Sequence, residues 1–313
     1  MSIRNLDLMF APKSVALIGA SAKEGSVGNV LMNNLLAAGL SGPVWGVNPR
    51  GGEIAGCKAF EDVASLPEAP DLAVIATPPQ TVPGLIDELG RRGTKAAVVI
   101  TAGFGELGEE GRALQAKMLE AAKPHLLRIA GPNCIGIAAP GNGLNASFVH
   151  VKPEKGNVAF VSQSGAIVTA VLDWASSRGI GFSHIASLGG MADVDFGDML
   201  DYLAADPKTK SILLYIESVT DARKFMSAGR QAARLKPVIV IKAGRHEAGA
   251  RAAASHTGAL AGSDAVYQAA FRRAGMLREL GIEDLFDAVE TLSTRSERRP
   301  ILGDRLGILT NGG

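Results

Sequence analysis

Aromatic residues are scarce in this chain, and cysteine is scarcer still. Phe, Trp and Tyr together make up 5% of the 313 residues, which disfavours a protein that binds RNA or single-stranded DNA by stacking bases on aromatic rings. The two cysteines, Cys57 and Cys134, fit neither a disulfide framework nor the ligand spacing of a zinc site. Because thiols stay reduced inside cells, we expect both to be free thiols of a cytoplasmic protein.

Long hydrophobic runs and an excess of one charge are also missing. No apolar stretch reaches the ~18–20 residues that span a bilayer, and the N-terminus lacks the order of regions found in a signal peptide. The 32 Lys and Arg residues nearly balance the 31 Asp and Glu residues, so bulk charge attracts the chain neither to nucleic acid nor to an anionic membrane. We predict no partner of either kind.

The first part of the chain alternates short apolar runs with longer amphipathic segments. This alternation predicts βαβ units and a parallel sheet with helices on its faces. Five apolar runs have the pattern of buried strands: residues 14–20, 43–49, 72–77, 96–101 and 128–133. We therefore predict an α/β fold that begins with a doubly wound domain over residues 1–135.

A second series of strands and helices follows residues 136–155, a segment rich in Gly, Pro and Asn that we expect to be a linker. Four more apolar runs, at 157–165, 182–189, 211–218 and 237–244, predict a second doubly wound domain over residues 156–297. The tail, 298–313, has the pattern of the first strand of a third domain. Since a single strand cannot bury its own faces, we expect the chain to be part of a longer protein.

The stretch GASAKEGSVG, residues 19–28, follows the first predicted strand and opens a helix. Glycines at such a turn let backbone N–H groups approach a phosphate at the helix N-terminus. The spacing is not G-x-G-x-x-G, and Asn48, Pro49 and Arg50 stand where a dinucleotide enzyme holds an acidic residue. Arginine suits a ribose that carries an extra phosphate, as in NADP or coenzyme A. A tight turn without any ligand is the other alternative.

Small and polar residues end two more strands at the same expected edge of the sheet. Thr77 and Pro78 end the third run, and Asn133 and Cys134 end the fifth. The carboxyl ends of parallel strands face the ligand crevice of an open sheet. These residues are therefore candidates for ligand binding, with plain turn chemistry as the alternative.

The second domain carries two features of an anion site. The turn of Ser162, Gln163, Ser164 and Gly165 opens its first helix, where hydroxyls, free N–H groups and the helix dipole favour negative charge. Glu217 ends a strand of continuous apolar residues, where an unpaired carboxylate is costly. The alternatives are a serine that only caps the helix and a solvated carboxylate at a strand end.

Asp193 and Asp195 form a D-x-D pattern that invites a Ca²⁺ or Mg²⁺ site. No further acidic ligands follow at the spacing of a metal-binding loop, so we expect this pair to cap the helix that follows. The sequence thus predicts no metal site.

One histidine, His256, lies among small residues in the stretch ARAAASHTGALAG, residues 250–262. It has neither the bulky neighbours of a core histidine nor the nearby ligands of a metal site. A carboxylate that accepts Nδ1–H would leave Nε2 as a nucleophile. With Glu217 as that carboxylate and the SQSG turn as an anion cradle, the three parts form a hypothetical phosphohistidine site. We expect structural or solvated roles for His125, His150, His184 and His246.

The sequence resembles the NDP-forming acyl-CoA synthetases, relatives of the succinyl-CoA synthetase α subunit. The likeness covers nearly the whole chain, because PKSVALIGAS with VGN, VNPRGG, GPNCIGI, VAFVSQSGA and SHTGALAGSD occur in the family's order and spacing. The resemblance implies a Rossmann-like CoA-binding domain followed by a flavodoxin-like, doubly wound ligase domain. It also implies the reaction acyl-CoA + phosphate + ADP ⇌ carboxylate + CoA + ATP, with acetate as the favoured acid.

The same resemblance implies roles for single residues. His256 would carry the phosphoryl group, Glu217 would orient His256, and the phosphate cradle would consist of Ser162, Gln163, Ser164 and Gly165. Around coenzyme A would lie Gly19, Ser21, Gly28, Asn48, Arg50, Thr77, Pro78, Asn133 and Cys134. ADP or ATP with Mg²⁺ would bind an ATP-grasp domain or subunit outside this chain, and the protein would form an oligomer.

Three stretches look similar to a branch of this family that is fused to a GNAT acetyltransferase domain: GLNASF (143–148), LDWASSRGIGFSH (172–184) and LLYIESVTDARKF (213–225). That branch is implied to act as an acyl-CoA sensor in protein lysine acetylation, with protein substrates as further partners. This regulatory role is the alternative function. An NADP-dependent oxidoreductase is a third hypothesis, but it leaves His256, the SQSG turn and the second domain without a role.

Overall fold

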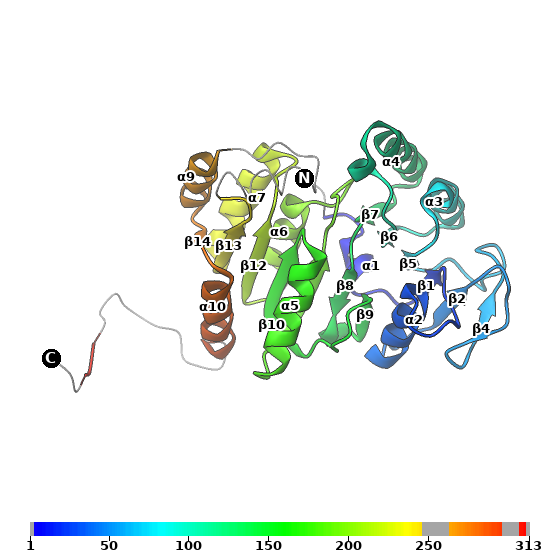
Figure 1. The fold of residues 1–313 in the computed structure, drawn as a ribbon, viewed down its shortest axis with the longest axis horizontal. Coiled ribbons are helices and arrows are strands. Elements are labelled where there is room, and N and C mark those ends of the chain that lie inside the picture. Colours follow the sequence, from blue (N-terminus) through cyan, green and yellow to red (C-terminus); the bar gives the residue numbers. More distant parts are fainter. Residues whose placement is uncertain (1–2, 246–262, 296–306, 311–313) are drawn as a thin grey trace.

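The computed structural model describes residues 3–245, 263–295 and 307–310, of which 3–245 and 263–295 form two α/β units (Figure 1). The strands of the first unit are β1 (Val15–Ile18), β2 (Val44–Val47), β3 (Glu53–Ile54), β4 (Cys57–Phe60), β5 (Leu72–Ile75), β6 (Ala96–Val99) and β7 (Arg128–Ala130). Its helices are α2 (Val27–Ala38), α3 (Val82–Arg92) and α4 (Gly108–Ala122), with short 3₁₀ turns η1 (Pro79–Thr81), η2 (Gly105–Leu107) and η3 (Lys123–His125). The described strands are ordered β3-β4-β2-β1-β5-β6-β7 and are parallel except for the β3–β4 pair.

The second unit repeats this architecture with a different strand order. Its strands are β8 (Gly136–Ala139), β9 (Leu144–Ser147), β10 (Lys155–Ser162), β11 (Phe182–Ser187), β12 (Ser211–Ile216), β13 (Val238–Lys242) and β14 (Leu277–Glu279). Its helices are η4 (Pro140–Asn142), α5 (Gly165–Ser176), α6 (Phe196–Ala205), α7 (Ala222–Leu235), α9 (Asp264–Ala274) and α10 (Ile282–Arg295). The described strands are ordered β14-β13-β12-β10-β11-β8-β9. The five strands from β10 to β14 are parallel and have the flavodoxin-like order, which confirms the predicted fold class.

Residue choice explains why these segments become strands and helices. Strands β1, β5 and β6 are buried along their whole length, as expected of parallel strands with helices on both faces. Helix α2 starts at Ser26, whose hydroxyl accepts the N–H of Asn29, and ends at Gly39 with a φ of 86°. A side-chain cap at the start and a left-handed glycine at the end are common helix boundaries.

Two segments differ from the sequence-based expectation. The predicted linker, residues 136–155, holds β8, η4, β9 and the first residue of β10, and β8 pairs antiparallel with β11. Ile137 and Leu144 of this hairpin are fully buried, so short apolar strands were hidden between Gly, Pro and Asn turns. A five-residue helix, α1 (Leu6–Phe10), was not predicted at all, because one helical turn is too short to show a period.

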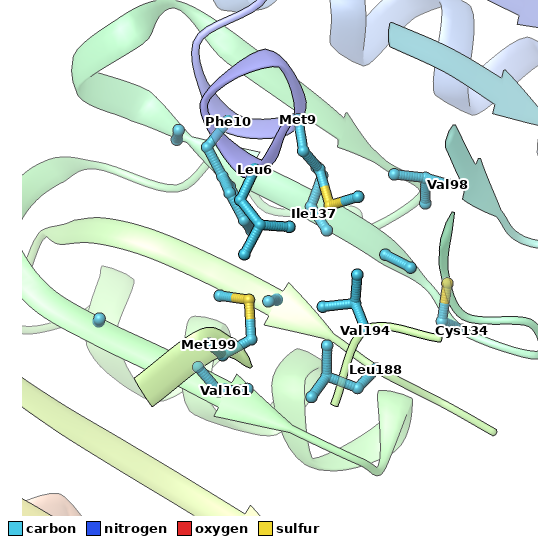
Figure 2. Packing of buried hydrophobic residues seen from close by; sticks show 14 of the residues in the cluster. Leu6, Met9, Phe10, Val98, Cys134, Ile137, Val161, Leu188, Val194 and Met199 are labelled. Carbon is cyan, nitrogen blue, oxygen red and sulfur yellow. The ribbon is translucent and has the colours of Figure 1, made fainter. Parts of the chain in front are cut away.

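The hydrophobic core runs from one unit into the other. One cluster of buried side chains includes Val98 of β6 together with Val161 of β10 and Met199 of α6. Figure 2 shows Met9 and Phe10 of α1 among these side chains. Phe10 stacks on Tyr202 and meets His184 edge-on, with ring centroids 5.3 and 5.2 Å apart. The N-terminal segment therefore helps to join the two sheets.

Only part of the tail predicted as the first strand of a third domain can be compared. Residues 307–310 belong to no strand, and Ile308 and Leu309 are exposed. The rest of 298–313 lies outside the described residues. Within the part of the chain that the structure describes, no helix combines the length and the apolarity needed to cross a bilayer.

Candidate active site

A cleft of about 800 Å³ opens where both sheets present the carboxyl ends of their strands. The first sheet contributes the segments after β5, β6 and β7, and the second contributes those after β10, β11 and β12. The strand order changes direction between β1 and β5 in one sheet, and between β10 and β12 in the other. Open α/β sheets bind ligands at such switch points, so this cleft is the candidate site.

The turn predicted to hold phosphate supplies three residues to this cleft: Gln163, Ser164 and Gly165. Ser162 is fully buried, and its hydroxyl donates to the Ser164 carbonyl over 2.7 Å and accepts the Ser164 N–H over 3.1 Å. Ser162 therefore shapes the turn and does not line the cleft. Ser164 is the N-cap residue of α5, but its side chain makes no capping hydrogen bond to a described residue. The alternative of a serine that only caps the helix is not what the geometry shows.

The side chain of Gln163 ties this turn to the end of β12. Its Oε1 accepts the backbone N–H groups of Glu217, at 3.0 Å, and Ser218, at 2.9 Å, while its Nε2 lies 3.1 Å from the Ser218 hydroxyl. Gln163 is 8% exposed, so these hydrogen bonds are shielded from water. A single buried amide therefore fixes Glu217 relative to the SQSG turn.

Glu217 is half-buried and lines the cleft beside the turn. Burial and the charge of Glu217 both raise the pKa of Tyr215. Burial lowers the pKa of Lys242, whereas the carboxylates of Asp264 and Glu217 act in the opposite direction. The structure thus brings together Glu217 and the SQSG turn, as predicted. The third predicted member, His256, lies outside the described residues, as does His246.

The turn between β1 and α2 of the first unit depends on two glycines. Gly19 has a φ of 97°, and a β-carbon added to it would lie 2.5 Å from the carbonyl oxygen of Ala76. A β-carbon added to Gly28 would lie only 2.0 Å from the carbonyl oxygen of Gly19. Because α2 packs this closely against the end of β1, as in dinucleotide-binding folds, only glycine fits at these two positions.

Ser21, Asn48 and Arg50 surround this turn without lining the cleft. The Ser21 hydroxyl accepts the N–H of Lys23 at 3.1 Å, and Asn48 Nδ2 donates to the carbonyl of Ala20 at 2.7 Å. Asn48 Oδ1 also accepts the Arg50 N–H at 2.9 Å, and the Arg50 side chain is exposed. The predicted residues thus divide into a group at β1 and β2 and a group inside the cleft.

Thr77, Pro78, Asn133 and Cys134 belong to the group inside the cleft. Asn133 has a left-handed φ of 56°, and its N–H donates to the carbonyl of Thr101 at 2.9 Å. The Thr101 hydroxyl in turn donates to the Thr77 carbonyl at 2.7 Å. These bonds join the ends of three neighbouring strands into one wall.

Cys134 contributes to this wall as a protonated thiol. It is 5% exposed and lies 3.4 Å from the carbonyl oxygen of Val99. Burial raises its pKa to about 12. Since the thiolate is the nucleophile in cysteine chemistry, Cys134 is a packing residue and not a nucleophile.

The loop after β11 closes the cleft from the second unit. The N–H of Gly190 donates to the carbonyl of Pro132 at 2.8 Å, and the N–H of Val194 donates to that of Ile129 at 3.0 Å. Gly189 and Met191 of this loop line the cleft. The two units therefore share a backbone seam directly beside Asn133 and Cys134.

The D-x-D pattern lies at the end of this loop, where Asp195 caps α6 as predicted. Asp193 does not cap this helix but accepts the N–H of Ile129. Oδ1 of Asp195 accepts the N–H groups of Gly197, at 2.8 Å, and Asp198, at 3.1 Å, in a full capping box. Its Oδ2 accepts the hydroxyl of Thr220, which lines the cleft, at 3.3 Å. Asp195 thus connects the cap of α6 to the segment after Glu217.

A chain of ion pairs crosses between the units at the same place. Arg128 of β7 pairs with Asp193 at 2.8 Å and with Asp198 at 2.9 Å. Lys224 of α7 reaches Asp198 at 2.6 Å and Asp195 at 2.9 Å. Burial lowers the pKa of Arg128, but the hydrogen bonds and charges of Asp193 and Asp198 outweigh burial and raise it overall. The guanidinium therefore stays charged inside the interface.

Several residues of the cleft were not predicted from the sequence. They include Val27, Thr101, Glu106, Arg112, Gln115, Ile135, Phe148, Gly189, Gly190, Met191, Ser218 and Thr220. Arg112 is the one cation among the described residues that line the cleft. Ile135 directly follows the predicted pair Asn133 and Cys134, so its position was the available signal. Phe148 lies in the segment that was expected to be a linker.

Comparisons with known proteins agree with this architecture. A model of CoA binding domains matches residues 13–140, and a model of succinyl-CoA ligase like flavodoxin domains matches residues 155–292. The ADP-forming acetate–CoA ligase I of Archaeoglobus fulgidus is 46% identical over 98% of this chain, which spans 44% of that relative. The α subunit of the ADP-forming acetate–CoA ligase I of Pyrococcus furiosus is 44% identical over 99% of this chain, which spans 67% of that subunit.

A solved structure leads to the same family. The dinucleotide-forming acetyl-coenzyme A synthetase 1 of Ca. Korarchaeum cryptofilum, in complex with phosphate and ADP, superposes with a TM-score of 0.88. It is 41% identical, and the match covers 92% of this chain and 62% of that one. The chain therefore belongs to the ADP-forming acetate–CoA ligase α-subunit-like family, with a CoA-binding domain followed by a succinyl-CoA ligase-like domain.

Proposed function

We propose that this chain is the CoA-binding and phosphohistidine-bearing part of an ADP-forming acyl-CoA synthetase that acts on acetate. One observation carries the proposal. The SQSG turn and Glu217 meet at the switch point of the second sheet, in the same cleft that Thr77, Asn133 and Cys134 line from the first sheet. A CoA-side wall and an anion cradle thus face one space, as transfer between a thioester and phosphate requires.

In this proposal the cradle and the carboxylate have separate roles. The N–H groups at the start of α5 lack intrahelical partners and attract phosphate oxygens, and Ser164 adds a hydroxyl. Glu217 accepts the Nδ1–H of His256, which leaves Nε2 to receive the phosphoryl group. Gln163 keeps Glu217 in place through the two backbone hydrogen bonds described above.

Coenzyme A would bind the candidate residues of the first unit. The closely packed turn of Gly19 and Gly28 leaves backbone N–H groups at the start of α2 for the diphosphate. Arg50 is exposed beside this turn, where it would hold the 3′-phosphate. Thr77 and Asn133 would line the path of the pantetheine arm to the thioester carbon. When bound, coenzyme A supplies the thiol that carries the acyl group.

ADP would bind elsewhere, on an ATP-grasp domain or subunit with Mg²⁺. The chain spans less than half of the Archaeoglobus relative and about two thirds of the Pyrococcus subunit, which supports a further part that completes the cycle. Membership of the ligase family argues against an NADP-dependent oxidoreductase. The acetyltransferase-linked role has no support among the relatives named above and stays a prediction.

Phosphate labelling tests the proposed chemistry on this chain alone. Incubation with acetyl-CoA and radiolabelled phosphate should produce an acid-labile, base-stable label, and His256→Ala should abolish it. Glu217→Gln should reduce the labelling rate steeply, because the imidazole loses its charged acceptor. A label that persists in His256→Ala would refute the phosphohistidine assignment.

A further inference from the structure

We propose that Ile135 and Phe148 set the size of the acyl group, and that they restrict the enzyme to short, unbranched monocarboxylic acids. This inference rests on the proposed function, because it assigns a substrate class to the same cleft. Both residues are half-buried apolar side chains that line the cleft.

Ile135 lies where the two functional walls of the cleft meet. It follows Asn133 and Cys134 of the CoA-side wall directly, and it packs against the glycine of the phosphate turn. A β-carbon added to Gly165 would lie only 2.5 Å from Cγ2 of Ile135. The acyl carbon must pass from the thiol of coenzyme A to a phosphate oxygen held at this turn. The isoleucine side chain therefore borders the space in which the acyl group reacts.

Hydrogen bonds on both sides of Ile135 hold it in place. Its N–H donates to the hydroxyl of Ser187 at 3.2 Å, and its carbonyl accepts the N–H of Phe148 at 3.1 Å. Ser187 is the last residue of β11 and is fully buried. Because the backbone is fixed at both ends, Ile135 cannot withdraw readily to admit a larger acyl group.

Phe148 adds a second apolar surface next to Ile135. It packs against the core shared by the two units, so its ring is also supported from behind. Gly189 and Gly190, which lie against Pro132 and Asn133, contribute no side chains to the cleft, so Ile135 and Phe148 are bulky apolar side chains on this part of its lining. A small acyl group fits beside Ile135 and Phe148, whereas a branched chain or a ring clashes with them.

The charges of the cleft favour an acid with a single carboxylate. The ionisable groups among its described lining residues are Glu106, Glu217 and Arg112, besides the buried thiol of Cys134. Glu217 lies on the side of the phosphate turn, whereas Arg112 belongs to α4 of the first unit. A second carboxylate on the acyl chain would thus approach Glu217, and like charges at short range repel.

The labelling reaction with a series of acyl-CoA thioesters tests this inference. The wild-type chain should be labelled at least about tenfold faster with acetyl-CoA than with isobutyryl-CoA or phenylacetyl-CoA, since small size differences in an apolar pocket give about 10- to 200-fold discrimination. Ile135→Ala and Phe148→Leu should each bring the branched or aryl thioester to within about threefold of acetyl-CoA. Ile135→Val should give an intermediate ratio and is the milder variant.

Ile167→Ala is the matched control, because Ile167 is a half-buried isoleucine of α5 that does not line the cleft. It should leave the ratio between thioesters unchanged. If Ile135→Ala and Phe148→Leu keep the wild-type ratio while acetyl-CoA still labels the chain, the inference is wrong and the proposed function stands. If no thioester labels the wild-type chain, the proposed function fails and the inference falls with it.

Discussion

Replacing Arg128 with methionine should destabilise the protein far more than the same change at Arg91. The Arg128 side chain is 7% exposed and bridges Asp193, 28% exposed, and Asp198, 1% exposed. Arg91 pairs with Asp87 on the surface, where the two side chains are 69% and 38% exposed. Solvent and salt screen the surface pair, whereas the loss of Arg128 removes the cation that pairs with Asp193 and one of the two cations that pair with the buried Asp198.

The loss in the free energy of unfolding depends on which ion pairs remain after the substitution. Removing one partner of a buried ion pair costs about 3–5 kcal/mol. Lys224 still pairs with Asp198 at 2.6 Å, so we expect a loss near the lower end, about 3 kcal/mol. For a chain of 313 residues, with about 2.1 cal/mol/K of unfolding entropy per residue, that corresponds to a fall in Tm of roughly 5 °C.

Urea unfolding followed by circular dichroism measures this loss, and a double-mutant cycle tests its cause. Lys224→Met alone leaves Asp198 with Arg128, and Arg128→Met alone leaves it with Lys224. The double variant leaves Asp198 with neither cation, so its loss should exceed the sum of the single losses. Equal losses in Arg128→Met and Arg91→Met, or strictly additive losses in the cycle, would refute the reasoning.

Three further predictions concern single side chains. Burial lowers the pKa of His184 to about 4, below the ~6.5 of an unfolded chain. The contribution of neutral His184 to the free energy of unfolding is therefore complete above about pH 6.5 and falls by on the order of 3 kcal/mol as the pH drops to about 4. Unfolding curves of His184→Asn should lack this pH dependence of the free energy of unfolding, and an unchanged dependence would contradict the prediction. Iodoacetamide at pH 8 should modify the half-buried Cys57 before Cys134, whose thiol stays protonated, and peptide mass spectrometry would expose the reverse order. Arg50→Ala should raise the Kd for coenzyme A more than the Kd for 3′-dephospho-coenzyme A, whereas calorimetry showing equal losses would place Arg50 elsewhere.

Much of this fold was predictable because its strands are buried on both faces. Such strands appear in the sequence as continuous apolar runs, and each of the nine apolar runs named above coincides with a strand, including β1 (Val15–Ile18) and β12 (Ser211–Ile216). The β8–β9 hairpin was missed because antiparallel edge strands are short and their turn residues dominate the local composition. Its membership of the second sheet depends on β11, which is distant in sequence.

The site was predictable to the extent that function lies at strand ends. Glu217 and the SQSG turn could be named because each directly follows an apolar run. Phe148 and Arg112 could not, since nothing local marks an apolar or helical residue as facing a cleft formed by two sheets, and Ile135 was marked only by its place directly after Asn133 and Cys134. Ser162 was predicted to line the site but does not. Its hydroxyl makes both of its hydrogen bonds to the backbone of Ser164 within the turn, and the sequence alone does not reveal such bonds.

The hydrophobic core that runs between the two units determines whether the chain can be divided into separate domains. A break near residue 140, between the regions that match the two families, would uncover Met9 and Val98 on one piece and Val161 and Met199 on the other. Each piece would expose to water an apolar surface that the other piece covers in the intact chain, and such surfaces promote aggregation. Neither half is thus a self-sufficient unit, and the two should melt together as one.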